Sequence, residues 1–434
     1  MSDDKRSPLR LGVAGLGTVG VGVVNIVEQS AAMLSARAGR DIVISAVSAR
    51  DRGRDRGIDL TSYAWHDNAV DLAVDDSVDL VVELMGGSDG PAYELAKACL
   101  AAGKPFVTAN KALIATHGKE LAGLAEASGT ALRFEAAVAG GIPVVKALME
   151  GLTSNKINQL YGILNGTCNY ILTRMEREKL AFDHVLAEAQ KIGYAEADPT
   201  FDIDGIDTAH KTAILAAIAF GIAPDLDNLP TEGIRGIAPV DIDYARELGY
   251  RIKLLGVARQ TDEGVEVRVH PAMVPLSSPL ASVMDATNAV LITGDQVGQT
   301  GYEGPGAGQG PTASSVIADV VDIARGICYP PLGVPVSELK SLPYLGSTSH
   351  IGTYYIRLRV TDVPGVMAEI TKSLAAETVS IESMLQRGHA DEGGVYIVLT
   401  THETTEQSAI AALSHFNALD CVLESPAMLR IEKA

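Results

Sequence analysis

The sequence feature that most constrains the fold is a glycine-rich turn that follows a short apolar segment and precedes a second one. Residues Leu9–Ala14 have the composition of a buried strand, and Gly15–Gly20 then carry glycine in the order G-x-G-x-x-G. Such glycines allow a tight turn, close approach of the backbone to a pyrophosphate, and close packing of helix on strand. An ordinary tight turn would use the same residues, but the strand before and the helix after them favour a dinucleotide site. Its predicted contacts are the three glycines, Gly15, Gly17 and Gly20.

The segments after this turn alternate between strand-like and helix-like patterns. Strands are predicted at 41–47, 79–84 and 105–108, with a helix at 92–102. This alternation predicts a parallel, doubly wound α/β sheet over roughly residues 8 to 135. Beyond it, helical windows at 182–191 and 207–221 are mixed with strand-like runs at 265–269 and 289–292, which predicts an α+β region.

The chain of 434 residues is long enough for about three domains at ~150 residues each. A second glycine-rich loop at 304–310 is followed by Pro311, a favoured first-turn residue, and by an apolar helix that we expect to return to the first domain. A segment rich in Pro, Gly and Ser then precedes a βαββαβ pattern. The predicted parts are a nucleotide domain at 1–143 plus about 304–330, an α+β domain at 144–303, a linker at 331–349 and a small domain at 350–434.

Composition narrows the class of partner. The chain has 35 Lys and Arg against 54 Asp and Glu, a net charge of −19, and only 5% aromatic residues. This balance disfavours nucleic acid, because it repels phosphate backbones and offers few stacking platforms. The four cysteines are scattered without a CxxC pair, so neither a zinc site nor a disulfide framework is predicted. The first residues lack a leader's apolar core, and we expect a cytoplasmic protein that binds no membrane.

The residues after the second predicted strand bear on the choice of dinucleotide. NAD-selective sites commonly place Asp or Glu at the end of this strand, to bind the ribose 2′-hydroxyl. Here Arg50 occupies that region, Asp51 comes one position later, and further arginines follow at 52, 54 and 56. A solvated charged loop is the alternative, but the arginines favour NADP(H) over NAD(H).

Two lysines and several acids are candidates for the chemistry. Lys111 follows a predicted strand at its carboxyl end, where open α/β sheets bind ligands. Lys211 lies four residues after Asp207, on a helix face that continues through apolar residues and therefore points inward. Either lysine could instead lie on the surface, Lys211 in a simple salt bridge. Acids beside lysines suit a zwitterionic amino-acid substrate, and a lysine can protonate the alkoxide formed when a carbonyl accepts hydride.

The chain resembles the homoserine dehydrogenases that carry a C-terminal ACT domain. The resemblance rests on ordered segments that include GLGTVG at 15–20, TANKALIA at 108–115, GILNGTCNYIL at 162–172 and GYAEADPTFDIDGIDTAHK at 193–211. Further matching segments are FEAAVAGGIP at 134–143 and GPGAGQGPTASSV at 304–316. The resemblance implies reversible NAD(P)-dependent interconversion of L-aspartate 4-semialdehyde and L-homoserine, in the biosynthesis of threonine, methionine and isoleucine. It also implies that residues 144–303 bind substrate and mediate dimerisation.

The resemblance also assigns residues. Lys211 would donate a proton to the nascent alkoxide, Lys111 would assist at the reacting oxygen, and Glu196 and Asp207 would hold the substrate. A monovalent cation, usually sodium, would be held largely by backbone carbonyls. The implied dinucleotide contacts are Gly17, Thr18, Val19, Arg50, Thr108, Lys111, Gly193 and Gly308, and the implied cation ligands are Glu135, Val138, Gly140 and Ile142.

The C-terminal turn at 362–365 is similar to the effector loop of ACT domains. This likeness predicts feedback inhibition by L-threonine and a homodimer or homotetramer; the alternative is a tail that only joins subunits. Two other functions remain open. One is another ACT-bearing dehydrogenase, acting on 3-phosphoglycerate or prephenate, which would rely on a His/acid pair and an arginine. The other is a catalytically inert amino-acid sensor, which the retained lysines and acids disfavour.

Overall fold

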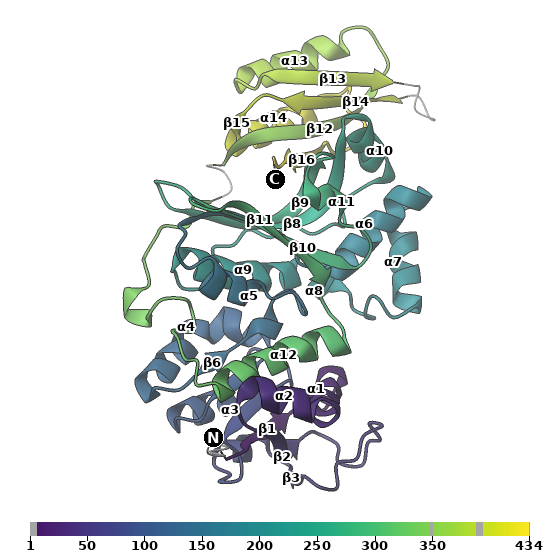
Figure 1. Ribbon diagram of the computed structural model, residues 1–434. Coiled ribbons are helices and arrows are strands. Elements are labelled where there is room, and N and C mark those ends of the chain that lie inside the picture. Colours follow the sequence, from purple (N-terminus) through teal and green to yellow (C-terminus); the bar gives the residue numbers. More distant parts are fainter. Residues whose placement is uncertain (1–6, 347–349, 388–393, 434) are drawn as a thin grey trace. The chain divides into compact units, whose positions relative to one another are not determined.

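The computed structural model describes residues 7–346, 350–387 and 394–433 (Figure 1). The chain forms two compact units, each assembled from three separate stretches. Unit 1 contains Met1–Leu164, Ala209–Leu229 and Thr287–Leu342, and unit 2 contains Asn165–Thr208, Pro230–Ala286 and Pro343–Ala434. The boundaries of these units differ from the predicted domain boundaries. The predicted domain boundaries remain predictions.

Unit 1 is built on a six-stranded parallel sheet, as the strand–helix alternation predicts. The strands follow the order β3-β2-β1-β4-β5-β6, and every pair is parallel. The order reverses between β1 and β4, and ligands of doubly wound sheets bind outside the strand ends at such a point. The strands are β1 (Leu9–Ala14), β2 (Ile42–Ser48), β3 (Ala64–His66), β4 (Leu80–Glu83), β5 (Phe106–Thr108) and β6 (Leu132–Arg133).

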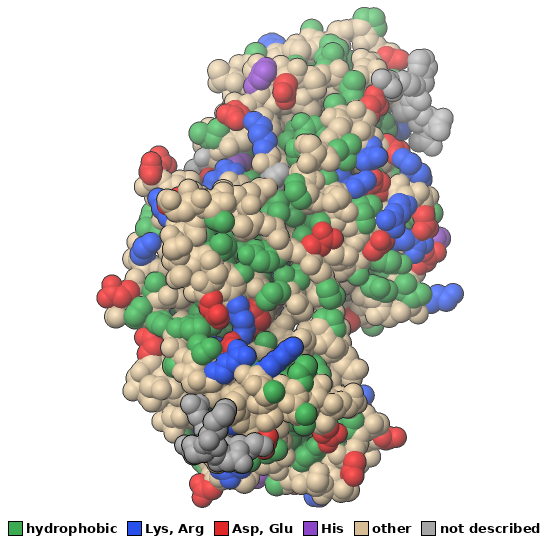
Figure 2. Space-filling model, in the orientation of Figure 1, with side chains coloured by type: hydrophobic (Ala, Val, Ile, Leu, Met, Phe, Trp, Pro, Cys, Tyr) green, Lys and Arg blue, Asp and Glu red, His purple; other side chains and the backbone are tan. Residues whose placement is uncertain are grey.

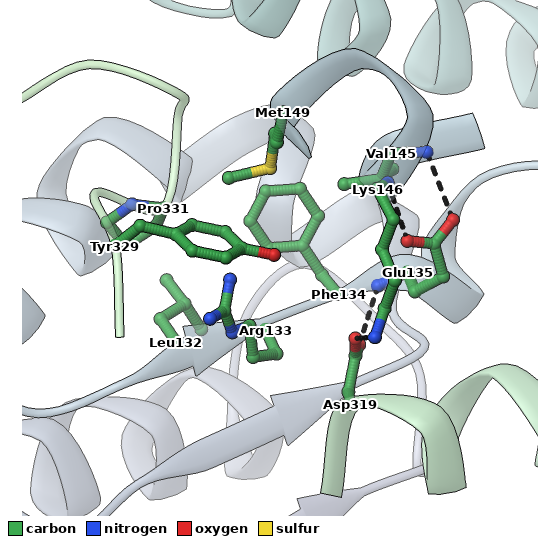
Figure 3. Close-up of a pocket in the computed structure, with 10 residues that line it drawn as sticks. All are labelled: Leu132, Arg133, Phe134, Glu135, Val145, Lys146, Met149, Asp319, Tyr329 and Pro331. Carbon is green, nitrogen blue, oxygen red and sulfur yellow. Dashed lines mark hydrogen bonds and ion pairs between the residues drawn. The ribbon is translucent and has the colours of Figure 1, made fainter. Parts of the chain in front are cut away.

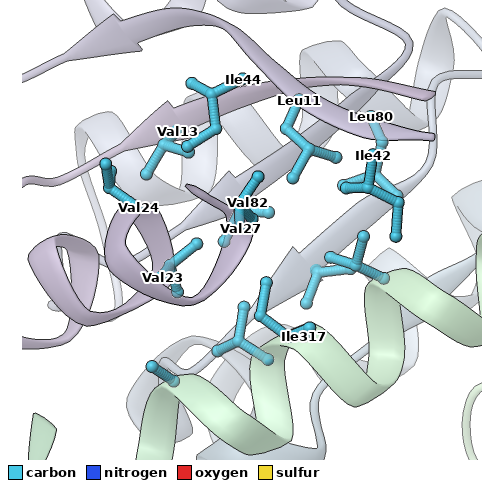
Figure 4. Close-up of a cluster of buried hydrophobic side chains, with 14 of the residues drawn as sticks. Leu11, Val13, Val23, Val24, Val27, Ile42, Ile44, Leu80, Val82 and Ile317 are labelled. Atoms are coloured by element: carbon cyan, nitrogen blue, oxygen red, sulfur yellow. The ribbon is translucent and has the colours of Figure 1, made fainter. Parts of the chain in front are cut away.

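Different helices cover the two faces of this sheet. Helices α1 (Thr18–Gln29), α2 (Ala31–Ala38) and α12 (Gln309–Ala324) pack on one face through a continuous apolar cluster (Figure 4). Val23 of α1, Ile317 of α12 and Leu11 of β1 all belong to this cluster, and burying a side chain of this size contributes about 1.5–3 kcal/mol. The helix after the second glycine-rich loop therefore packs on the parallel sheet of unit 1. Helices α3 (Pro91–Ala101) and α4 (Lys111–Ser128) pack together and contribute no residue to this cluster.

The rest of unit 1 contains an antiparallel sheet of β7 (Ile157–Ile163), β10 (Thr287–Gly294) and β11 (Gly298–Pro305). The glycine-rich sequence gave no expectation of β11, because its alternating small residues lack the apolar side chains that mark a strand. Helix α9 (Ile206–Phe220) spans both units and begins within one residue of its predicted start. The shorter elements of unit 1 are α5 (Val144–Lys146), a π-helical turn (Ala147–Gly151) and 3-10 turns at Ala69–Ala73, Glu135–Ala137 and Val336–Glu338.

Unit 2 contains a mixed sheet in the order β8-β9-β16-β12-β14-β13. The strands are β8 (Tyr250–Gln260), β9 (Val265–Pro275), β12 (Ile351–Thr361), β13 (Ile381–Arg387), β14 (Gly394–Thr401) and β16 (Ala427–Ile431), with a short β15 (Thr404–Thr405) beside β12. Its helices are α6 (Gly166–Glu178), α7 (Phe182–Lys191), α8 (Thr200–Ile203), α10 (Pro239–Glu247), α11 (Pro279–Ser282), α13 (Val366–Ala376) and α14 (Glu406–Asn417). The order β12-α13-β13-β14-α14-β16 confirms the predicted βαββαβ pattern. Strand β16 pairs in parallel with β9, with Arg430 opposite Ala272.

A buried ionic network lies where β9 and β16 meet. The Arg268 guanidinium donates to Glu266 at 2.9 Å and to Glu432 at 2.7 Å, and it lies 3.1 and 3.2 Å from ring nitrogens of His270 and His350. Burial alone would raise the pKa of Glu432, but the hydrogen bond from His270 and the charge of Arg268 hold that pKa below its usual value. The charges buried where β9 and β16 meet are therefore paired with one another, and His270 is part of this network.

Acidic and basic side chains are interspersed on the face shown in Figure 2. No single helix of the described residues is long and apolar enough to cross a membrane. Only α1 and α2 taken together pass that test of length and composition, and they are bent by 82°.

Candidate active site

The three glycines of the first turn have three different roles. Gly15 has a φ of 99°, in the left-handed region that favours glycine. A Cβ on Gly20 would lie 2.1 Å from the Gly15 carbonyl oxygen, so only glycine lets α1 pack this close. Gly17 is the N-cap of α1, where a Cβ would meet nothing and no side chain caps the helix. The first N–H groups of α1 are thus approachable by an anionic pyrophosphate, which fits the predicted dinucleotide.

A hollow of about 420 Å³ opens beside this turn in unit 1. It is lined by Gly15 and Gly17, by the end of β2 at Ser48 and by the exposed Arg50 and Arg54. The following arginine, at 56, also lines it but donates to the carbonyl oxygens of residues 16, 51 and 54, so it braces the loop. Arg50 and Arg54 therefore line the hollow with exposed side chains, whereas the arginine at 56 holds the loop in place.

A second hollow, of about 290 Å³, is lined by Val19, Lys111 and Lys211. The two hollows share the lining residues Leu84–Gly86, so they adjoin each other; together, from the glycine turn to both lysines, we call them the groove. Lys211 is buried, and its Nζ donates to the Leu164 carbonyl oxygen at 2.7 Å. The structure thus brings together the two lysines that the sequence places 100 positions apart.

Glu83, at the carboxyl end of β4, immediately precedes the Leu84–Gly86 segment that lines both hollows, and its role was not predicted. It is fully buried, and its Oε1 accepts the backbone N–H groups of Met85 and Gly86 at 2.6 and 3.1 Å. Its Oε2 accepts the Thr108 hydroxyl at 2.6 Å. The carboxylate therefore fixes the backbone of the loop that lines both hollows, and Thr108 contributes to this arrangement through its bond to Glu83. An acid that ends an apolar strand was the only sequence signal for it.

The acids that the sequence singles out belong to unit 2. Asn165 precedes α6, and its Nδ2 donates to Asp202 Oδ1 and to Asp207 Oδ2, each at 2.8 Å. Asp207, which is predicted to bind the substrate, is only 3% exposed, so its carboxylate is buried within unit 2. Glu196 is exposed in the loop between α7 and α8, as is Gly193. Of the predicted dinucleotide and substrate residues, those that line neither hollow are Thr18, Gly20, Thr108, Gly193, Glu196, Asp207 and Gly308.

Comparisons with known proteins decide the family. The sequence pattern of homoserine dehydrogenase matches residues 143–321, that of the homoserine dehydrogenase NAD-binding domain residues 15–135, and that of the ACT domain residues 354–421. The homoserine dehydrogenase of Pseudomonas aeruginosa is 44% identical over 98% of this chain and 99% of its own. The chain belongs to the homoserine dehydrogenase family. It is an oxidoreductase that acts on a CH–OH group, with a nucleotide-binding domain and an ACT domain.

Two further relatives agree. The homoserine dehydrogenase of Neisseria gonorrhoeae is also 44% identical, over 98% of this chain and 99% of its own. A crystal structure of a homoserine dehydrogenase from Thiobacillus denitrificans has a TM-score of 0.93 at 45% identity and covers 99% of both chains. The family and its ACT form, inferred from the motifs, are therefore confirmed.

The loop predicted to bind a cation in this homoserine dehydrogenase is tightly folded. Ala139 and Gly140 have φ of 54° and 53°, and a Cβ on Gly140 would lie 2.4 Å from the Gly306 carbonyl oxygen. The Gly140 carbonyl accepts the Ser315 hydroxyl, and the Ile142 carbonyl accepts the Val144 N–H. Each carbonyl oxygen has a second lone pair, which can serve a cation. The donor set therefore fits a hard cation held by oxygens.

The Glu135 side chain serves another purpose in this loop (Figure 3). Its carboxylate accepts the backbone N–H groups of Val145 and Lys146 at 3.0 and 2.8 Å. Burial, with the nearby charge of Asp319, raises the pKa of Glu135 to about 8. No three His, Cys, Asp or Glu side chains among the described residues gather to hold a metal ion.

Proposed function

We propose that this enzyme interconverts L-aspartate 4-semialdehyde and L-homoserine, with Lys211 and Lys111 at the reacting oxygen. The observation that carries the proposal is the groove of unit 1, which runs from the glycine turn to both lysines. A nicotinamide dinucleotide held by Gly17, Val19 and the start of α1 would supply or accept the hydride. A proton must accompany each hydride that reduces the aldehyde. The Lys211 ammonium, a general acid, would donate that proton from Nζ.

The chain's own residues then have separate tasks. The Lys211 ammonium protonates the alkoxide oxygen in reduction and takes the proton back in oxidation. Lys111 adds positive charge beside the same oxygen, which stabilises the negative charge that develops there. Asp207 and Glu196 bind the substrate ammonium. The carbonyls of Glu135, Val138, Gly140 and Ile142 hold sodium, which has a structural role.

The test is homoserine oxidation by Lys211→Met and Lys111→Met. General acid–base groups contribute about 10²- to 10⁴-fold, so we expect a loss of kcat of that order for Lys211→Met and a smaller one for Lys111→Met. Dinucleotide binding, measured by fluorescence titration, should persist. Wild-type activity on 3-phosphoglycerate or prephenate in place of homoserine would overturn the substrate, and unchanged oxidation by Lys211→Met would overturn the mechanism.

We also propose NADP(H) as the preferred dinucleotide, because Arg50 and Arg54 line the hollow at the end of β2. A hyperthermophilic archaeal homoserine dehydrogenase, 23% identical over 74% of this chain, is described in complex with NADPH. The comparison of kcat/KM for NADPH and NADH tests this, and a strong preference for NADH would refute it.

Threonine inhibition through the ACT domain and a homodimer or homotetramer complete the proposal. Deleting the ACT domain is a poor test, because β16 pairs with β9 and Glu432 neutralises the buried Arg268. Asp362→Ala, in the exposed turn before α13, should instead remove threonine inhibition and keep basal activity. Light scattering gives the oligomeric state, and replacing sodium by choline tests the cation.

A further inference from the structure

The start of α6 carries an unusual concentration of side-chain hydrogen bonds. Asn165 is the N-cap of this helix, with φ of −121° and ψ of 110°, and its Oδ1 accepts the Cys168 N–H at 2.8 Å. Asparagine is among the best N-cap residues because its carbonyl satisfies an N–H that has no partner within the helix. The capping bond fixes which end of the amide faces the helix, since an oxygen must accept there and an NH₂ group could not.

The other end of the same amide faces two carboxylates. Nδ2 has two hydrogens, and its two bonds go to Asp202 on α8 and to Asp207 on α9. Asn165 is 5% exposed and Asp207 is 3% exposed, so both groups are shielded from water that could replace these bonds. One neutral group thus joins two like charges that would otherwise repel each other, and it fixes one oxygen of each.

The helix that carries Asn165 is itself anchored one turn later. Lys253 Nζ donates to Asn169 Oδ1 at 2.8 Å, and Asn169 Nδ2 donates to the Val283 carbonyl oxygen at 3.2 Å. A Cβ on Gly166 would lie 2.8 Å from the Ala286 carbonyl oxygen, so the first residue of α6 also lies close to this neighbouring segment. The position of the Asn165 backbone is therefore set independently of the two acids.

We propose that Asn165 is a positioning residue for the reaction, which acts through Asp207. Its NH₂ group ties Asp207 to Asp202 and orients the Asp207 carboxylate toward the substrate ammonium. This inference rests on the proposed function, because it takes Asp207 to bind the amino group of homoserine. Asn165 itself touches neither substrate nor dinucleotide in this assignment.

The decisive variant is Asn165→Asp. Asp caps a helix as well as Asn does, so α6 keeps its cap while both donors to the carboxylates are lost. We expect the KM for homoserine to rise about 10- to 100-fold, as for the loss of a hydrogen bond to a charged group, with the KM for the dinucleotide within twofold of wild type. The introduced carboxyl faces two carboxylates, so it should take up a proton near neutral pH and then donate one bond. Relative to wild type, the homoserine KM of this variant should therefore improve as the pH falls from 8 to 6.

Two further variants separate positioning from stability. Asn165→Ser keeps a capping oxygen but has no amide, so it should raise the homoserine KM without the recovery at low pH. Thr405→Ala removes the cap of α14, where the Thr405 hydroxyl accepts the Ser408 N–H, and it should lower the melting temperature without changing either KM.

A double-mutant cycle with Asp207→Asn completes the experiment. In that background Asn165→Asp should add little to the homoserine KM, because the two side chains act as one unit. An unchanged homoserine KM for Asn165→Asp, in an enzyme whose Asp207→Asn variant does raise it, would overturn the positioning role. Loss of stability alone, as in Thr405→Ala, would overturn it too. A wild-type enzyme that fails to oxidise homoserine would instead overturn the proposed function.

Discussion

Glu83 in unit 1 and Asn165 in unit 2 are both buried polar residues, but their hydrogen-bond partners differ in charge. Glu83 is a charged group whose partners are neutral, since it accepts two backbone N–H groups and a hydroxyl. Asn165 is a neutral group whose Nδ2 partners are charged, since it donates to two carboxylates. In the first region, the acceptor capacity of the carboxylate is used within the loop that it fixes. In the second region, a neutral amide holds two carboxylates close together. We therefore expect the first arrangement to tolerate an anionic ligand nearby and the second to favour a cationic one.

Glu83→Gln tests the dinucleotide side and carries the largest expected effect. An amide cannot accept at both of its ends, so at least one of the three bonds is lost and the Leu84–Gly86 loop is released. Hydrogen bonds to charged groups are worth about 1.5–3 kcal/mol, and we expect the dinucleotide KM to rise ~10- to 100-fold. The homoserine KM should change less than twofold. Steady-state kinetics with each substrate varied in turn check this, and Glu94→Gln, an exposed acid on α3, is the control.

Lys253→Met tests the substrate side through pH. Burial, with the charge of Arg251, lowers the pKa of Lys253 to about 7 from 10.5. The unfolded chain therefore binds more protons than the native one between about pH 7 and 10, and wild-type stability should rise with pH there by up to ~1.4 kcal/mol per unit. The variant should lose this contribution and raise the homoserine KM severalfold. Urea unfolding at pH 7.5 and 9.5 measures the free energy of unfolding of both proteins. An equal change in that free energy between the two pH values would contradict the claim that Lys253 is neutral in the native protein.

Thr108→Val removes the donor to Glu83 and the acceptor of the Asn110 N–H, while its shape is retained. We expect a loss of about 1–3 kcal/mol in the free energy of unfolding and a rise of a few fold in the dinucleotide KM. Chemical denaturation measures the free energy of unfolding, and steady-state kinetics measure the dinucleotide KM. A homoserine KM that rose as much would mean that Glu83 does not serve the dinucleotide region alone.

Arg50→Ser should give the smallest change. Arg50 is exposed, and an ion pair with a 2′-phosphate in that setting is worth at most ~1 kcal/mol. The KM for NADPH should rise about two- to fivefold, and that for NADH should stay constant. Equal changes for both would show that the arginine does not distinguish them.

The sequence predicted the parts of this molecule that local pattern determines. Apolar runs and glycine spacing located β1, the turn at Gly15–Gly20 and the βαββαβ order, because these depend on neighbours along the chain. It also singled out Lys111 and Lys211, which line the same hollow. It missed β11, whose strand character comes from pairing with β10 along its whole length rather than from its own side chains.

The roles of Glu83 and Asn165 escaped prediction for a related reason. Glu83 meets Thr108 25 positions away, and Asn165 meets its two acids 37 and 42 positions away. Nothing in either local segment announces those partners. An acid after an apolar strand and an asparagine before a helix are common in sequences. The contacts that distinguish these two residues are seen only in the folded structure.

The pairing of β16 with β9 imposes an order on biosynthesis. Translation at 5–20 residues per second needs ~10–30 s to pass from one of these strands to the other. During that interval Arg268 lacks Glu432, and the β9 edge that β16 will cover offers unpaired N–H and C=O groups to any other strand. Unit 2 therefore completes its sheet late in synthesis, and the nascent chain is most exposed to aggregation while it waits for a strand that the ribosome has not yet made.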